Sequence, residues 1–233
     1  LYLFNSECHD KRVIFKKSIM KKYKINNDYK FYFFGRTRSR SFWLEYLSAN
    51  KDYYFDKYHP EIKSEKYIVI VGSGYYGNYY ANIESAFIKM LDILKVHFCD
   101  YHFFYKPHPL TPIEFVIEQF QSRELNYSIT YLHPNILVTR AHAFVSNAFS
   151  NLLIDAYLFG IPTIEFSNYT DWCLEITNGN STSTKYVDYF IDNDPKKFVK
   201  TLNNVIVNSK KTEVNLTSFS IDEKGSEKVL NLF

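Results

Sequence analysis

The stretch YIVIVGSGYYG, residues 67–77, decides the fold class of this 233-residue chain. Its first five residues are β-branched and aromatic, which is typical of a strand buried on both faces of a parallel sheet. A glycine-rich turn follows, and residues 82–96 then carry apolar side chains at helical spacing. A strand, a tight turn and a helix are therefore predicted in succession. The sequence before residue 62 is less regular, and the polar segment 58–66 is interpreted as a linker.

The alternation of strands and helices continues along the chain. Further strands are predicted at 101–106, 127–132, 143–146 and 162–166, and further helices at 111–121, 151–160 and 194–208. Thr111 is expected to cap its helix, and Gly160 to end the next one. This pattern predicts an α/β fold with a doubly wound parallel sheet, a Rossmann-like nucleotide-binding domain over residues 63–233. Residues 1–62 are expected to be part of a second domain and its linker.

The composition excludes some classes of function. The net charge is +3, from 28 basic and 25 acidic residues, which is too balanced for a nucleic-acid-binding surface. The three cysteines show no metal-binding or disulfide spacing, so a reducing cytoplasm is expected. We see no signal peptide, and no apolar run approaches the roughly 18 residues that a membrane-spanning helix needs. Peripheral attachment to the inner membrane stays open.

Ligands of such sheets bind at the carboxyl ends of the strands, so the residues that close the strands are the first site candidates. Residues 72–77 read G-x-G-x-x-G, which resembles a dinucleotide-binding turn. That type of site needs an acidic residue near the end of the next strand, and here that strand ends in Lys106. Gly72 and Gly74 are therefore interpreted either as a tight turn or as a backbone wall for another anionic ligand.

The segment Lys106-Pro107-His108-Pro109 stands where the strand 101–106 ends. Proline fixes φ and biases the preceding residue toward extended geometry, so His108 has little backbone freedom. A fixed imidazole beside a lysine can donate to a phosphate and carry a proton. The alternative is a stiff turn with a purely structural role.

A second polar loop follows the strand 143–146 and leads into a helix. It contains Ser146, Ser150 and Asn151, whose side chains and neighbouring backbone N–H groups suit phosphate binding at a helix start. The alternative is that one of the serines only caps the helix. The remaining histidines suggest no metal site, because no third ligand accompanies His97 and His102.

Together, KPHP and the later SNAFSNLLIDAYLFGIPTI resemble bacterial GT-B glycosyltransferases of the sialyltransferase type. The most similar group comprises the lipooligosaccharide sialyltransferases and capsule polysialyltransferases, which carry an HP motif and a Ser-Ser motif in their nucleotide-binding domain. The resemblance covers residues 67–208. It implies a donor-binding domain at 63–233 and an acceptor-side region at 1–62.

The resemblance also assigns roles to individual residues. His108 and Pro109 match the HP motif, whose histidine contacts the donor phosphate, and Ser150 matches the first serine of the second motif. Asn151 replaces the second serine, and its amide can still donate to phosphate. Asn135 lies in the Pro134-Asn135-Ile136 segment, where the family often has a glutamate for the ribose hydroxyls. The missing carboxylate leaves the nucleotide open.

The implied reaction moves sialic acid from CMP-sialic acid onto a glycan or glycolipid acceptor such as lipooligosaccharide or capsule. It needs no metal or other cofactor. The family's general base stands in an acidic-acidic-Gly motif, which this sequence lacks. Two alternatives therefore stay open: a Kdo or glycerophosphate transferase of surface-polymer synthesis, and a non-catalytic nucleotide- or glycan-binding domain. The sequence also leaves open whether residues 1–60 pack on another domain, on a second copy in a homodimer, or on a membrane.

Overall fold

The computed structural model describes residues 2–4, 31–33, 41–62, 67–73, 79–138 and 140–208. The chain divides into two compact units, one formed by Leu1–Leu47 with Asn215–Phe233 and the other by Ser48–Val214. In the first unit, β1 (Tyr2–Phe4) pairs in parallel with β2 (Phe31–Phe33). The second unit carries the predicted sheet and the candidate site residues.

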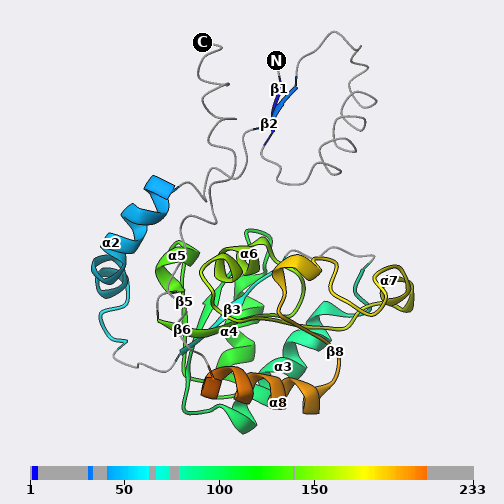
Figure 1. Ribbon diagram of the computed structural model, residues 1–233. Helices are drawn as coiled ribbons and strands as arrows, with labels where there is room; N and C mark the ends of the chain where they lie inside the picture. The colour runs from blue at the N-terminus through cyan, green and yellow to red at the C-terminus, as the bar shows by residue number, and fades with distance from the viewer. Residues whose placement is uncertain are drawn as a thin grey trace. The chain divides into compact units, whose positions relative to one another are not determined.

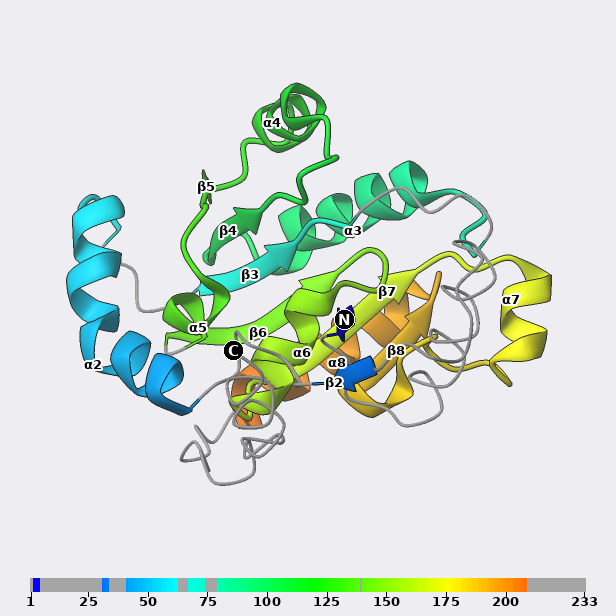
Figure 2. The same ribbon diagram turned by 90° about the horizontal axis from the view of Figure 1, so that it is seen from above.

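The core of the second unit is a sheet of six parallel strands in the order β5-β4-β3-β6-β7-β8 (Figures 1 and 2). The strands are β3 (Tyr67–Val71), β4 (His102–Lys106), β5 (Tyr127–Ile129), β6 (Ala141–Ser146), β7 (Thr163–Ser167) and β8 (Tyr189–Asp192). Numbered along the chain, they follow the 3-2-1-4-5-6 order of doubly wound sheets. The α/β prediction is confirmed. The order reverses between β3 and β6, so a ligand is expected at the carboxyl ends of these two strands.

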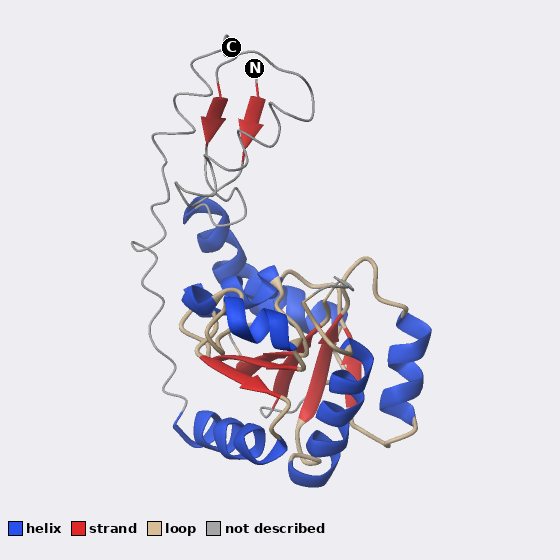
Figure 3. Ribbon diagram, turned by 90° about the vertical axis from the view of Figure 1, so that its right-hand side faces the viewer, coloured by secondary structure: helices blue, strands red, loops and turns tan. Residues whose placement is uncertain are grey.

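Helices cover both faces of the sheet (Figure 3). The helices of the described residues are α2 (Ser41–Tyr58), α3 (Ile83–His97), α4 (Ile113–Gln121), α5 (Pro134–Leu137), α6 (Asn151–Leu158), α7 (Asp171–Ile176) and α8 (Pro195–Asn208), with a 3₁₀ turn at Thr184–Tyr186. In Figure 1, α3 and α8 lie below the sheet, and α5 and α6 lie above it. No helix in the described part of the chain is long and apolar enough to cross a bilayer.

Alternation along each strand divides the side chains between the two faces. In β3, Ile68 and Ile70 join a core cluster with buried side chains of α3, α4 and α8, among them Met90 and Phe198. Fully burying a side chain of this size contributes about 1.5–3 kcal/mol. The opposite face of β3 carries Tyr67, whose hydroxyl donates to the Leu137 carbonyl of α5 at 2.9 Å. Strands buried on both faces explain why the sequence shows near-continuous apolar runs here.

Several local predictions are corrected. Thr111 does not cap α4: Pro112 occupies the N-cap position, and the Thr111 hydroxyl instead accepts from the His108 N–H at 3.1 Å. Helices α2, α5 and α7 and strand β8 were not predicted. Helix α2 has no clear apolar stripe and is held by tertiary contacts, such as Phe55 against Tyr67 at a centroid distance of 5.9 Å. Gly160 ends its helix as expected, with φ of 67°.

Candidate functional site

The carboxyl ends of β3 and β4 meet in a close backbone contact at Gly72. The Gly72 N–H donates to the Lys106 carbonyl at 2.8 Å. A Cβ at residue 72 would lie 2.7 Å from the Tyr105 hydroxyl, 2.8 Å from the His108 nitrogen and 3.2 Å from the Lys106 oxygen. Only glycine fits here, because two of these neighbours are backbone atoms. Gly72 thus fixes the KPHP turn against the end of β3, and Gly74 lies outside the described residues.

Hydrogen bonds hold His108 in one orientation. Its N–H donates to the Thr111 hydroxyl at 3.1 Å, and its carbonyl accepts from the Thr111 N–H at 2.9 Å. Its ring Nδ1 accepts from the Leu110 N–H at 3.2 Å. Because Nδ1 accepts a backbone proton, the neutral ring carries its own proton on Nε2. No residue in the described ranges accepts that proton, so Nε2–H is a donor available to a ligand.

Lys106 and Pro109 flank this histidine. The Lys106 ammonium donates to the Leu132 carbonyl, in the segment after β5, at 2.6 Å. This contact holds the ammonium near the segment that follows β5. Pro109 is exposed in the turn that follows β4. The turn therefore has a half-buried cation on one side and the fixed imidazole on the other.

The second predicted motif occupies the loop from β6 to α6. Ser146 is fully buried, and its hydroxyl donates to the Val71 carbonyl at 3.2 Å and also contacts the Ala148 carbonyl. It joins the carboxyl ends of β3 and β6, where the strand order reverses. Ser150 is the N-cap of α6, and its oxygen accepts from the Leu152 N–H at 3.4 Å. Ser150 therefore caps α6, and its phosphate role stays a prediction.

Capping does not occupy the whole of the Ser150 hydroxyl. The cap uses the oxygen as an acceptor, whereas the hydroxyl proton has no acceptor among the residues that the structure describes. Asn151 is exposed as the first helical residue of α6. A hydroxyl donor, an amide and the first free N–H groups of a helix therefore lie together at one end of α6.

Asn135 lies in α5, the short helix between β5 and β6, and is only 2% exposed. Neither its amide nitrogen nor its amide oxygen has a partner in the described part of the chain. Its backbone N–H donates to Nδ1 of His133, the N-cap of α5, at 3.3 Å. A buried amide whose nitrogen and oxygen both lack a partner lowers the stability of the fold, and hydrogen-bonding groups of a bound ligand would supply the missing partners.

A buried carboxyl in β7, Glu165, connects the hydroxyl groups that surround the end of this strand. Glu165 Oε1 accepts from the hydroxyls of Ser167 and Tyr169 at 2.7 and 2.9 Å, and Oε2 accepts from the Ser181 hydroxyl at 2.6 Å. Burial raises the pKa of this carboxyl, and the three hydroxyl donors counteract that rise. Glu165 thereby ties the segments before and after α7 to the end of β7.

Tyr80, which sequence analysis did not single out, supports the β6–α6 loop directly. Its hydroxyl accepts from the Phe149 N–H at 2.8 Å, one residue before the Ser150 cap. Its ring packs edge-on against Tyr169 with a centroid distance of 5.1 Å. With 21 tyrosines in the chain, nothing in the sequence distinguishes this one. The β6–α6 loop is thus held by Tyr80, which packs against Tyr169, and Tyr169 in turn donates to Glu165.

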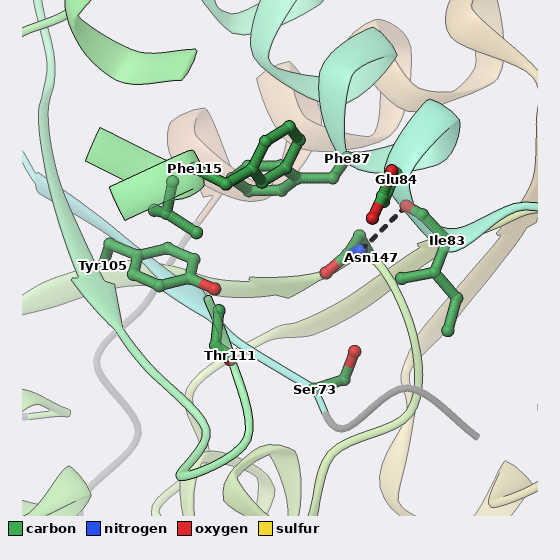
Figure 4. Close-up of a pocket in the computed structure, with 9 residues that line it drawn as sticks. Ser73, Ile83, Glu84, Phe87, Tyr105, Thr111, Phe115 and Asn147 are labelled. Carbon is green, nitrogen blue, oxygen red and sulfur yellow. Dashed lines mark hydrogen bonds between the residues drawn. The ribbon is translucent and has the colours of Figure 1, made fainter. Parts of the chain in front are cut away.

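A small pocket opens at the same edge, beside the starts of α3 and α4 (Figure 4). Its empty volume is about 270 Å³ and is open to solvent. Its lining comes from the ends of β3, β4 and β6 and from both helices: Ser73, Ile83, Glu84, Phe87, Tyr105, Thr111, Phe115, Val116 and Asn147. Thr111 connects the pocket to the turn of His108. Within the described ranges, no cluster of three or more histidine, cysteine or acidic side chains could hold a metal ion.

Comparison with known proteins defines the fold more closely. No protein-family model matches the chain, and no curated protein matches it. Among solved structures, UDP-GlcNAc 2-epimerase from Neisseria meningitidis, bound to UDP-GlcNAc, is similar, with a TM-score of 0.56, 15% identity, and coverage of 93% of this chain and 58% of that one. The wall teichoic acid polymerase TagF gives a TM-score of 0.53 and 14% identity, covering 92% and 54%.

A third similar structure is UDP-GlcNAc 2-epimerase from Methanocaldococcus jannaschii, in complex with UDP-GlcNAc and UDP. It has a TM-score of 0.52 and 16% identity, with coverage of 93% of this chain and 58% of that one. The chain has the α/β fold of GT-B proteins, the type of fold that binds nucleotide sugars in these structures. It spans between half and two thirds of the length of the three similar structures.

Proposed function

We propose that the chain is the donor-binding part of a glycosyltransferase that uses a nucleotide-activated sugar. The observation that carries the proposal is His108, whose backbone and Nδ1 are fixed by hydrogen bonds while Nε2–H stays available at the carboxyl edge of the sheet. Ser150 offers a second donor at the start of α6, beyond the end of the neighbouring β3 and β6. The GT-B fold is the context in which such an edge receives a nucleotide.

The proposed chemistry concerns the leaving phosphate. The bond between the anomeric carbon of the sugar and the phosphate oxygen breaks, and its electron pair stays on the phosphate. The acceptor hydroxyl forms the new bond to carbon and loses its proton to a base that this sequence does not reveal. His108 and Ser150 stabilise the charge on the phosphate, and Lys106 adds a positive field. We expect transfer to persist in EDTA, since the proposal assigns this role to side chains.

The finer proposal follows the resemblance of the motifs: sialic acid from CMP-sialic acid, moved onto a bacterial surface glycan in the cytoplasm or at the inner membrane. A Kdo or glycerophosphate transferase of surface-polymer synthesis is the second candidate, supported by the likeness in fold to the wall teichoic acid polymerase TagF. A binding domain without catalysis is the third, because no acidic-acidic-Gly motif stands in the sequence. Hydrolysis of the bound donor would separate a catalyst from a binding domain.

Two substitutions of one residue test the proposal sharply. His108→Asn places an oxygen near the position of Nδ1, which keeps the acceptor for Leu110 and removes the Nε2 donor. His108→Gln places its amide near the position of Nε2 and keeps a donor there. Calorimetry with CMP, UDP and CDP should show at least one nucleotide binding to the native chain. We expect His108→Asn to weaken it by roughly 10- to 100-fold and His108→Gln by less.

His97→Ala is the matched control, because His97 is exposed at the other end of α3, away from the carboxyl edge. It should leave nucleotide binding unchanged. Absence of binding by all three nucleotides would contradict the proposal. Equal binding by His108→Asn and the native chain would contradict the role of the imidazole.

A further inference from the structure

The pocket between α3 and α4 contains polar groups that the phosphate site does not use. Ser73 follows β3, is 7% exposed, and its hydroxyl has no partner among the described residues. In Figure 4 this hydroxyl points toward the space between Asn147 and Tyr105. Buried hydroxyls are nearly always hydrogen-bonded, so an unpaired one directed into a pocket indicates a missing partner.

Two further groups make the pocket rich in hydrogen-bond acceptors. Asn147 is 5% exposed, and its amide nitrogen donates to the Ile83 carbonyl at 3.2 Å, which directs the amide oxygen to the other side. Glu84 lines the same pocket from the first turn of α3. Carboxylate and amide oxygens can only accept, so a ligand here must present hydrogen-bond donors.

Apart from the hydroxyls of Tyr105 and Thr111, the rest of the lining is apolar, and it restricts the ligand further. Phe87, Phe115 and Val116 form one wall, and no lysine or arginine is among the described residues that line the pocket. A phosphate or carboxylate would meet the Glu84 charge without a cation to offset it. The chemistry that fits is a neutral polyol, whose hydroxyls donate to the acceptors while its C–H groups contact the phenyl rings.

We propose that this pocket binds the uncharged, hydroxyl-bearing edge of the sugar of the donor. The proposal rests on the proposed function, because the pocket adjoins the His108 turn through Thr111. The pocket is small and open to solvent, so it suits a single hydroxyl-bearing group of a sugar rather than a whole nucleotide sugar. The hydroxymethyl group of a neutral hexose and the glycerol side chain of a sialic acid share this chemistry.

The test compares each nucleotide with its sugar-bearing form. Calorimetry on the full chain would use UDP, UDP-glucose and UDP-N-acetylglucosamine in one arm, and CMP and CMP-N-acetylneuraminic acid in the other. In the arm that binds, we expect the sugar to increase affinity over the bare nucleotide. Ser73→Ala should reduce that increase roughly three- to tenfold and leave affinity for the bare nucleotide unchanged. The arm that responds identifies hexose or sialic acid.

Glu84→Gln should reduce the increase by about tenfold, because a hydrogen bond to a charged acceptor becomes one to a neutral acceptor. Two control variants make the same substitutions at residues that do not line the pocket. Ser85→Ala alters an exposed serine next to Glu84, and Glu114→Gln alters the acidic residue in the first turn of α4, which does not line the pocket. Both should behave as the native chain does.

The two proposals fail in different ways. If a nucleotide binds, but its sugar adds no affinity or Ser73→Ala and Glu84→Gln leave the increase unchanged, the pocket proposal is wrong and the phosphate site stands. If no nucleotide binds in either arm, both proposals are wrong. Thermal unfolding controls for a damaged fold, and Ser73→Ala is expected to be at least as stable as the native chain because it removes an unpaired hydroxyl.

Discussion

Replacing Gly72 by alanine tests whether the turn after β3 and the KPHP turn after β4 are packed against each other in one fixed arrangement. The added methyl would lie 2.7 Å from the Tyr105 hydroxyl, 2.8 Å from the His108 nitrogen and 3.2 Å from the Lys106 oxygen. Tyr105 can rotate away, but His108 and Lys106 contribute backbone atoms. The KPHP turn must therefore move, and the 2.8 Å hydrogen bond from the Gly72 N–H to Lys106 must lengthen or break.

The expected loss of stability follows from these contacts. Adding a methyl group to a packed site costs about 1–3 kcal/mol, and a lost backbone hydrogen bond adds about 0.5–1.5 kcal/mol. The sum is about 2–4 kcal/mol. For a domain of this size each kcal/mol lowers Tm by about 2–4 °C, so scanning calorimetry should show Tm lower by roughly 5–15 °C. Since the His108 turn moves, nucleotide affinity should fall by at least about tenfold.

Gly179→Ala is the matched control. Gly179 has φ of +69° and no atom within 4 Å of an added Cβ, so the substitution introduces backbone strain without a collision. It should lower Tm by only a few degrees, because the strain is about 1–2 kcal/mol, and leave nucleotide binding unchanged. If Gly72→Ala has the Tm and the nucleotide affinity of the native chain, the close contact between Gly72 and the KPHP turn is refuted.

Three further predictions concern the same unit. Asn135→Leu removes two unpaired amide atoms, so urea denaturation should show stability higher by about 2 kcal/mol, and an unchanged or lower value would mean that the amide has partners. Tyr80→Phe leaves the Phe149 N–H without its acceptor, which should cost about 1–2 kcal/mol; a native unfolding midpoint would refute this. Burial lowers the pKa of His59 and His102, so the unfolded chain binds more protons than the folded chain below about pH 6.5. The contribution of these two histidines to stability should be fully present above that pH and should decrease as the pH falls below it. If urea titrations at pH 7.5 and pH 5.5 give the same free energy of unfolding, the two imidazoles are not buried in the neutral form.

The fold was predictable where burial imposes a simple pattern. Strands such as β3 are buried on both faces, so their composition alone identifies them, and Gly160 marks the end of α6 by its positive φ. Helix α2 could not be predicted because its position depends on distant partners, such as the ion pair of Arg140 with Asp52 at 2.6 Å. Strand β8 has a single buried side chain, Ile191, which is too little for a periodic signal.

The candidate site was predictable in outline only. The rule that ligands meet the carboxyl ends of parallel strands located His108 and Ser150 from the sequence. The hydrogen-bond partner of each hydroxyl could not be predicted, because the Thr111 hydroxyl accepts from the His108 N–H instead of capping α4. Tyr80 acts on Phe149, which is 69 residues away in the sequence, and Glu165 reaches Ser181 beyond α7, and no local pattern marks such contacts.

Buried polar atoms without a hydrogen-bond partner indicate where a ligand binds. In the described part of the chain, the buried side-chain atoms without a partner belong to Ser73 and Asn135. Ser73 directly follows β3 at the carboxyl edge, and Asn135 lies in α5, the short helix that connects β5 to β6. Each unpaired group costs about 1–3 kcal/mol in the free protein, and folding alone gives no reason to keep it. A ligand that supplies the missing partners would recover this free energy on binding, so Ser73→Ala should stabilise the free protein and weaken its complex with the donor. A residue that matters only for folding cannot produce opposite signs in these two measurements.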